Sequence, residues 1–184
     1  MNRNTLKEAA VFALLLAIGV AGRWTQPTWN FTPLAAVTVI GGFYFRQTMP
    51  ALLLPVGVLA VSDLLLPIHD SWPVMASVYL MMFVPLLLGR SARNAQGLRR
   101  GLLLGISGVL PATAFYLVTN FAVWMFKSTY DATLEGLLTC YAAALPFYRW
   151  MLAGDIFYLG VLLACLAIAH AASPMASRDL AEQR

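Results

Sequence analysis

Three polar side chains lie inside long apolar segments of this sequence: Asp63, Asn120 and Asp155. In a membrane-spanning segment a carboxylate costs about 2.5–3.5 kcal/mol at the bilayer centre, and less near the surface, so it persists where it faces a polar cavity or a partner. Two acids and one amide from three separate segments therefore indicate a pocket that binds a polar solute. The alternative for each acid is a helix cap or an ion pair with Arg23 or Arg149 at the membrane interface.

The composition predicts that these segments lie in a membrane. Of the 184 residues, 60% are apolar and 11% are charged, against roughly 45–50% and about 25% in soluble domains. The mean hydropathy of +0.74 leaves too little polar surface for a body that faces water. A soluble globular enzyme is therefore excluded. We expect an all-α integral membrane protein whose net charge of +4 reflects loop arginines rather than nucleic-acid binding.

Six apolar runs predict a bundle of six transmembrane helices. Each crossing needs about 20 residues, because a helix rises about 1.5 Å per residue and the hydrocarbon core is about 30 Å thick. The whole chain, residues 1–184, then forms a single transmembrane domain. The expected spans cover approximately residues 5–22, 31–45, 49–66, 74–88, 101–126 and 150–172.

The segment between the fifth and sixth spans, residues 127–149, is too polar to be a further membrane crossing. Its apolar residues nevertheless recur at helical spacing and form one face, which predicts a short interfacial helix over approximately residues 132–145. Asp131 is the expected N-cap and Pro146 the expected stop. The helix would lie across one mouth of the bundle. Its apolar face consists of Leu134, Leu137, Leu138, Tyr141 and Leu145.

The distribution of Lys and Arg predicts the orientation of the bundle, because cytoplasmic loops hold the excess. With the N-terminus inside, nine of the 12 cationic residues lie in inner segments, which places both termini in the cytoplasm. The three outer ones are Arg23, Lys127 and Arg149. The first segment also has features of a secretion signal, with small residues at Gly19 and Ala21, but its removal would leave the rest of the map unchanged.

The outer loops hold most of the aromatic and polar residues, so the solute is expected to bind from outside. Trp24 and Trp72 are typical of the aromatic belt at a membrane surface. Trp29, Asn30 and Trp124 each lie beside a turn or a polar residue, which favours contact with the solute. The residues expected to bind the solute are Trp29, Asn30, Asp63, Asn120, Trp124, Tyr141, Arg149 and Asp155.

Catalytic and metal chemistry lack the residues they need. His69 and His170 are expected on opposite sides of about 30 Å of hydrocarbon, and nothing brings His69 to Cys140, so we predict no enzymatic activity. Without a C-x-x-C pair, Cys140 and Cys165 predict no metal cage or disulfide, and no metal or cofactor is expected. We interpret Cys140 as a small apolar residue, the alternative being a ligand for a soft metal or a corrinoid cobalt. A phosphate-cradling G-x-x-x-x-G-K-[ST] loop is absent, so transport would be powered elsewhere.

The first apolar segment carries a small residue at every fourth position. A stripe of this kind lets another helix approach closely, and such packing drives helix association in lipid. The stripe either packs within the bundle or docks a partner subunit. It consists of Ala9, Ala13, Ala17 and Ala21, with Gly22 adjoining.

Six helices in so short a chain, cytoplasmic termini, the alanine stripe and an outward-facing pocket resemble the substrate-binding (S) component of energy-coupling factor (ECF) vitamin transporters. More closely, residues 8–165 resemble a bacterial family of proposed transport proteins. The motifs that carry this second likeness are Asn30-Phe-Thr-Pro33 with Gly41-Gly42, Ser62-Asp63, Thr119-Asn120-Phe121 with Trp124, Gly136 to Tyr141, Pro146-Phe147 and Gly154-Asp155.

The resemblance implies a function as well as a fold. It implies a subunit of the bacterial cytoplasmic (inner) membrane that binds a water-soluble vitamin or related micronutrient for uptake. Its partner would be a module of one membrane subunit, docked on the alanine stripe, and two ATPases. A stand-alone transporter driven by an ion gradient is a variant of this hypothesis. The alternative is a structural membrane protein, such as a small scaffold of the cell-wall machinery.

Overall fold

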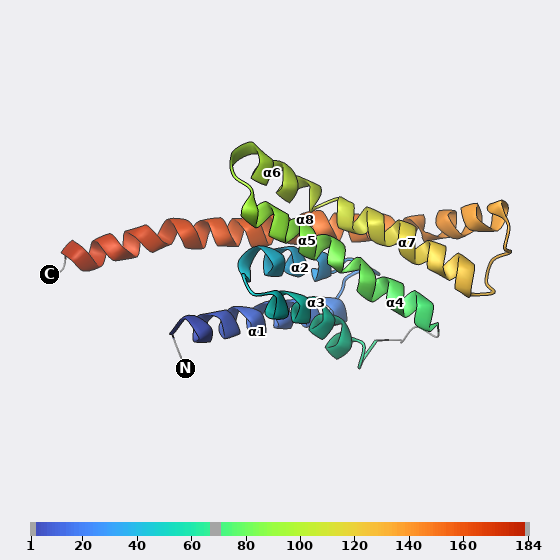
Figure 1. Cartoon of the computed structure of the whole chain (residues 1–184), viewed down its shortest axis with the longest axis horizontal. Coiled ribbons are helices and arrows are strands. Elements are labelled where there is room, and N and C mark those ends of the chain that lie inside the picture. The colour runs from blue at the N-terminus through green and yellow to red at the C-terminus, as the bar shows by residue number, and fades with distance from the viewer. Residues whose placement is uncertain (1–2, 67–70, 183–184) are drawn as a thin grey trace.

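The computed structural model shows an all-helical protein in the residues it describes, 3–66 and 71–182 (Figure 1). Side chains are described for residues 5–66 and 71–169. His69 and the side chain of His170 therefore lie outside the described part of the chain. The helices are α1 (Arg3–Trp24), α2 (Leu34–Tyr44), α3 (Thr48–Ser62), α4 (Trp72–Met81), α5 (Phe83–Asn94), α6 (Gly97–Ile106), α7 (Leu110–Phe126) and α8 (Leu134–Glu182).

Four helical segments are long and apolar enough to cross a membrane. They are Thr5–Trp24, Trp72–Asn94, Gly97–Phe126 and Leu134–Ala169. Two shorter apolar helices, α2 and α3, lie between the first and second of these segments. The prediction of an all-helical bundle compatible with a membrane protein is therefore confirmed, whereas six crossings stay a prediction.

Two of the long segments are interrupted where a proline follows. Met82 separates α4 from α5, three residues before Pro85, and residues 107–109 separate α6 from α7, just before Pro111. A proline has no N–H to donate to the carbonyl four residues earlier, so the helix ladder loses a bond on its N-terminal side. The prolines thus weaken the ladder at both breaks within otherwise apolar spans.

The predicted interfacial helix over 132–145 is wrong as a separate element. A single helix, α8, runs from Leu134 through Pro146 to Glu182. Its N-cap is Thr133, whose hydroxyl accepts a hydrogen bond of 3.1 Å from the Gly136 N–H, rather than Asp131. Thr139 and Tyr141 of this stretch donate to the backbone carbonyls of Glu135 and Leu117, at 2.8 Å and 2.9 Å. Satisfied in this way, they do not prevent the segment from packing with apolar helices.

The core of the bundle surrounds α2. Every residue from Leu34 to Gly42 is buried, although the helix has only 11 residues. A helix that is apolar on all sides is stable only inside a protein or a membrane. Its neighbours are α1, α3, α5 and α8. The largest buried side chains of the core include Val37, Phe45, Leu54, Val58 and Leu59.

Glycines allow α2 and α5 to touch backbone to backbone. A Cβ atom on Gly89 of α5 would lie 2.1 Å from the Val39 carbonyl oxygen of α2, and one on Gly42 would lie 2.4 Å from the Leu86 oxygen. Both distances are far inside van der Waals contact. In lipid this close approach replaces the hydrophobic effect as the force between helices.

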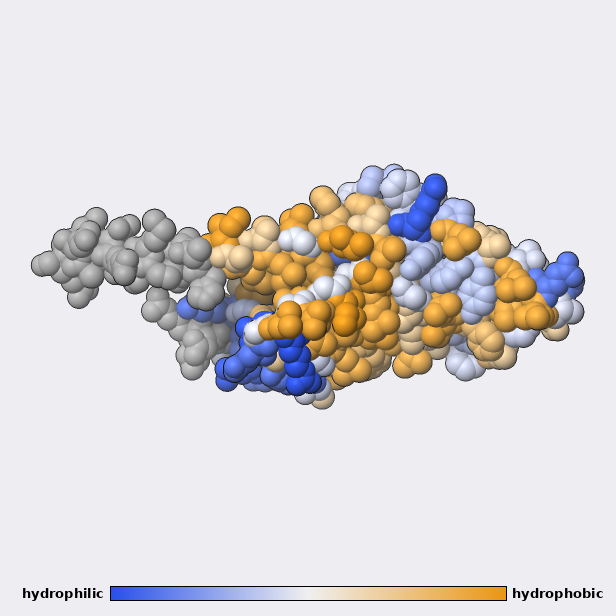
Figure 2. Space-filling model, turned by 90° about the horizontal axis from the view of Figure 1, so that it is seen from above, coloured by the Kyte–Doolittle hydropathy of each residue, from blue (hydrophilic) through white to orange (hydrophobic). Residues whose placement is uncertain are grey.

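Different parts of the chain lie towards the two ends of the bundle's long axis. In Figure 1 the start of α1, the end of α8, the α2–α3 turn and the α5–α6 turn lie towards one end. The loop after α1 and the connection from α7 to α8 lie towards the other, where the α7–α8 hairpin extends furthest. Figure 2 shows hydrophobic residues over most of the middle of one face, with hydrophilic residues nearer both ends.

Replacing Gly89 with alanine should destabilise the fold, because the added methyl group collides with backbone that cannot rotate away. We expect a loss of about 2 kcal/mol or more, in the range of overpacked cores. Gly101→Ala is the matched control, since no atom lies within 4 Å of its Cβ position and alanine favours a helix. Thermal unfolding in detergent compares the two variants, and equal melting temperatures would contradict the α2–α5 contact.

Candidate functional site

A cavity of about 460 Å³ lies where the loop after α1 meets α2, α4, α7 and α8. Much of its wall is apolar, as in most small-molecule sites, and a few polar groups interrupt it. The polar residues on the wall are Arg23, Gln26, Asn30, Thr32, Thr119, Lys127 and Asp155. The apolar ones include Trp29, Leu59, Val78, Met82, Phe115 and Met151.

Asp155 is the buried acidic residue of this wall, with 4% of its surface exposed. Gly154 brings it there, because a Cβ at that position would lie 3.1 Å from the Thr32 nitrogen, so α8 passes directly against the loop. The Ala112 N–H, in the first turn of α7, donates a hydrogen bond to the carboxyl group. The other oxygen, Oδ2, has no hydrogen-bond partner in the protein.

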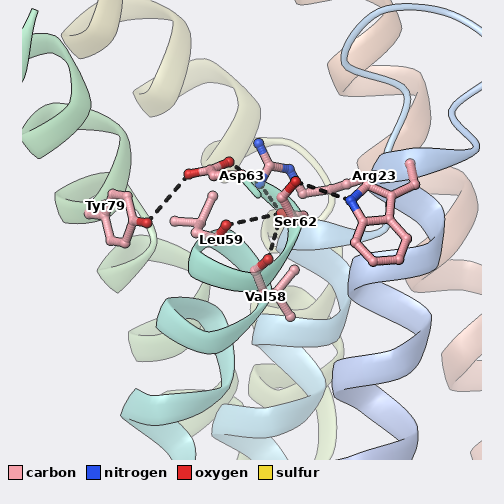
Figure 3. Close-up of polar contacts among 7 residues, drawn as sticks. Arg23, Val58, Leu59, Ser62, Asp63 and Tyr79 are labelled. Atoms are coloured by element: carbon pink, nitrogen blue, oxygen red, sulfur yellow. Dashed lines mark hydrogen bonds and ion pairs between the residues drawn. The ribbon is translucent and has the colours of Figure 1, made fainter. Parts of the chain in front are cut away.

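Asp63 does not line the cavity but anchors Arg23, which does (Figure 3). Arg23 Nη1 lies 2.8 Å from Asp63 Oδ1 and also donates to the Ser62 hydroxyl. The Tyr79 hydroxyl donates to Asp63 Oδ2 at 3.4 Å. The indole N–H of Trp24 donates to the Ser62 carbonyl oxygen at 3.0 Å. This network joins α1, α3 and α4, and the alternative for Asp63, an ion pair with Arg23, is observed.

Trp29 and Asn30 stand on the loop side of the cavity. Asn30 has a φ of +67°, a left-handed conformation that asparagine tolerates better than most residues. Its backbone N–H donates to Gln26 Oε1 at 2.9 Å, which closes the loop on itself. Trp29 is 64% exposed, so its indole ring stands at the mouth and can cover a bound solute.

Asn120 lines a smaller hollow of about 130 Å³ beside the main cavity. The two hollows share Asn30, Phe115, Thr119 and Met151 on their walls. The Asn120 side-chain nitrogen donates to the Tyr116 carbonyl oxygen at 2.8 Å, one turn earlier on α7. Asn120 thus lies next to the cavity rather than on it.

Three further residues predicted to bind the solute lie away from the main cavity. The Trp124 indole donates to the Asp131 carbonyl oxygen at 2.9 Å, and the Tyr141 hydroxyl donates to the Leu117 carbonyl oxygen at 2.9 Å. The exposed Arg149 guanidinium lies 5.4 Å from the ring centre of its neighbour Trp150. Trp124 and Tyr141 hold the α7–α8 hairpin together.

Sequence reasoning missed Phe115, Thr119 and Gln26 on the cavity wall. Thr119 and Phe115 lie one turn apart on the face of α7 that includes Ala112, so the helical spacing from an identified wall residue would have found them. Cys140 is buried, and its thiol lies 3.4 Å from the Asn120 carbonyl oxygen. Within the described residues no group of three His, Cys, Asp or Glu side chains could hold a metal ion.

Removing either partner of the Arg23–Asp63 pair should destabilise the protein, because a half-buried charge loses its counterion. We expect about 1–2 kcal/mol for Arg23→Gln or Asp63→Asn, since both side chains keep some contact with solvent. The double variant should lose less than the sum, with a coupling of about 0.5 kcal/mol or more. The free energy of unfolding in detergent is measured for all three variants. Additive losses would show that the contact between Arg23 and Asp63 does not contribute to stability.

Comparisons with known proteins give one result. No curated protein and no solved structure matches the chain. One family matches it from residue 3 to residue 176, nearly the whole sequence. The chain therefore belongs to that family, which is described as a family of unknown function (DUF6580).

Proposed function

We propose that this protein is a membrane-embedded subunit that binds a small water-soluble micronutrient and takes part in its uptake. The observation that carries the proposal is the cavity of about 460 Å³ with the buried Asp155 on its wall. Its volume lies in the usual range for small-molecule sites. Trp29, Asn30 and Arg23 provide aromatic and polar contacts around the same space.

The arrangement of the helices supports a site reached from one side of a membrane. Loop residues Gln26, Trp29 and Lys127 line the cavity, and the loop after α1 lies away from the two ends of the helical chain (Figure 1). In the proposed orientation these ends face the bacterial cytoplasm, together with the arginine-rich α5–α6 turn, as positively charged inner loops require. The cavity then faces outward and receives solute from outside.

The alanine stripe supports a partner subunit. Ala9, Ala13, Ala17 and Ala21 are all exposed, while Leu15 and Val20 of the same helix are buried in the core. The stripe therefore does not serve packing within the bundle. We propose that it docks a membrane subunit coupled to ATPases, as the resemblance to ECF transporters implies.

A solute should copurify with protein extracted gently from its native membrane. Native mass spectrometry would measure the occupancy, and Asp155→Ala should lower it by about tenfold or more, because a buried polar contact is lost. Arg149→Ala is the matched control, since this exposed arginine stands off the cavity. A chain that carries no solute and binds none from a micronutrient mixture would instead favour the structural scaffold.

A larger side chain in the alanine stripe should prevent uptake of the solute without preventing its binding. Ala13→Trp should abolish accumulation of the copurifying solute in cells, because a large side chain prevents close helix approach. Binding by the purified variant should stay within about twofold, since Ala13 is remote from the cavity wall. Val161→Trp, on an exposed part of α8, is the control of equal size. Undiminished uptake by Ala13→Trp would remove the stripe as a docking surface.

A further inference from the structure

The carboxyl group of Asp155 is only half satisfied by the protein. It accepts one hydrogen bond from the Ala112 N–H, and its Oδ2 atom is buried without a partner. A carboxylate inside a protein is stable only with a counter-charge or a full set of hydrogen bonds. Asp155 is one of the residues that line the cavity, so a solute bound there can reach its carboxyl group.

No cation described near the cavity satisfies Asp155 Oδ2. Arg23 is held by Asp63 and Ser62, and Lys127 has an interaction of its own within the protein. Arg149 is exposed and lies over Trp150. None of these residues is hydrogen-bonded to Asp155 Oδ2.

A purely structural role explains only part of this arrangement. Asp155 caps the first turn of α7 through Ala112, and a cap of this kind stabilises a helix by about 1 kcal/mol. Asparagine caps a helix as well as aspartate does. An acid that can carry a charge, placed on the cavity wall, exceeds what the cap requires.

We propose that the solute presents a nitrogen donor, protonated or N–H-bearing, to the carboxyl group of Asp155. This inference rests on the proposed function and narrows its substrate class to amines and other cationic or N–H-bearing nitrogen compounds. A charge-assisted hydrogen bond to a carboxylate is about twice as strong as a neutral one, and strongest where water is excluded. Leu59, Val78, Met82 and Phe115 supply an apolar surface for the rest of the solute. A solute with an anionic group at this position is rejected by like-charge repulsion.

Three probes of similar size and different charge test the inference. They are 3-phenylpropylamine, a cation, 4-phenyl-2-butanone, a neutral compound without a donor, and 3-phenylpropionate, an anion. Binding to the full-length protein in detergent is followed by quenching of tryptophan fluorescence, with detergent-only blanks. The amine should bind at least about tenfold more tightly than either of the others.

Asp155→Asn should reduce the preference for the amine to within about twofold, because it keeps the acceptor for Ala112 and cannot carry the charge that pairs with a cation. Asp155→Glu keeps the charge and should keep the preference. Asp131→Asn, an exposed acid off the cavity wall, is the control and should bind as the unaltered protein does. The ranking of the three probes in the unaltered protein is a test that does not depend on any variant folding.

Several results would overturn the inference: the ketone or the propionate binding as tightly as the amine, the preference surviving in Asp155→Asn, or the amine not binding at all. The proposed function fails separately. A copurifying solute without a nitrogen donor contradicts the amine specificity and leaves uptake intact, whereas a protein that binds no solute and no probe contradicts both.

Discussion

The backbone contact between α2 and α5 is the constraint on which the rest of the structure depends. Because Gly42 and Gly89 bring the two helices together, the 11 residues of α2 occupy the centre of the bundle, with other helices around them. The same placement holds Leu34 and Ala35, at the start of α2, on the cavity wall. Core packing and the candidate site therefore share one helix, and a change that separates α2 from α5 also alters the cavity.

A second close approach between backbones, at Gly154, sets the position of Asp155. Gly154 lets α8 run against the backbone of Phe31 and Thr32, so the neighbouring Asp155 enters between the loop and the first turn of α7. Three parts of the chain that are distant in sequence thus meet at one carboxyl group. Pro111 contributes by ending the preceding helix, which leaves the Ala112 N–H free for a side chain rather than a backbone partner.

Much of the fold could be predicted from the sequence, because helices that cross a lipid bilayer require long apolar runs. The break at Met82 and the continuity of α8 through Pro146 could not be predicted from the sequence. Whether a helix breaks at a proline depends on tertiary contacts, which compensate for the lost hydrogen bond in one place and not in the other. The site shows the same limit. Asp63 and Asp155 occupy similar apolar surroundings in sequence, and only the position of Arg23 in space makes one a paired acid and the other an unpaired one.

Two features contribute little to the stability of the isolated chain. In lipid, small residues strengthen packing only where another helix meets them, yet Ala9, Ala13, Ala17 and Ala21 face away from the bundle. Asp155 is a buried acid whose Oδ2 lacks a partner, and burying a polar atom without a hydrogen bond is unfavourable. Thr28 Oγ1 and Arg90 Nε and Nη2 are also buried without a partner, whereas Tyr116 bonds the Tyr141 carbonyl oxygen and Thr38 the Leu34 carbonyl oxygen. Natural proteins violate the rules of packing and pairing mainly at functional sites, so these two features support the proposal that a partner subunit and a solute bind there.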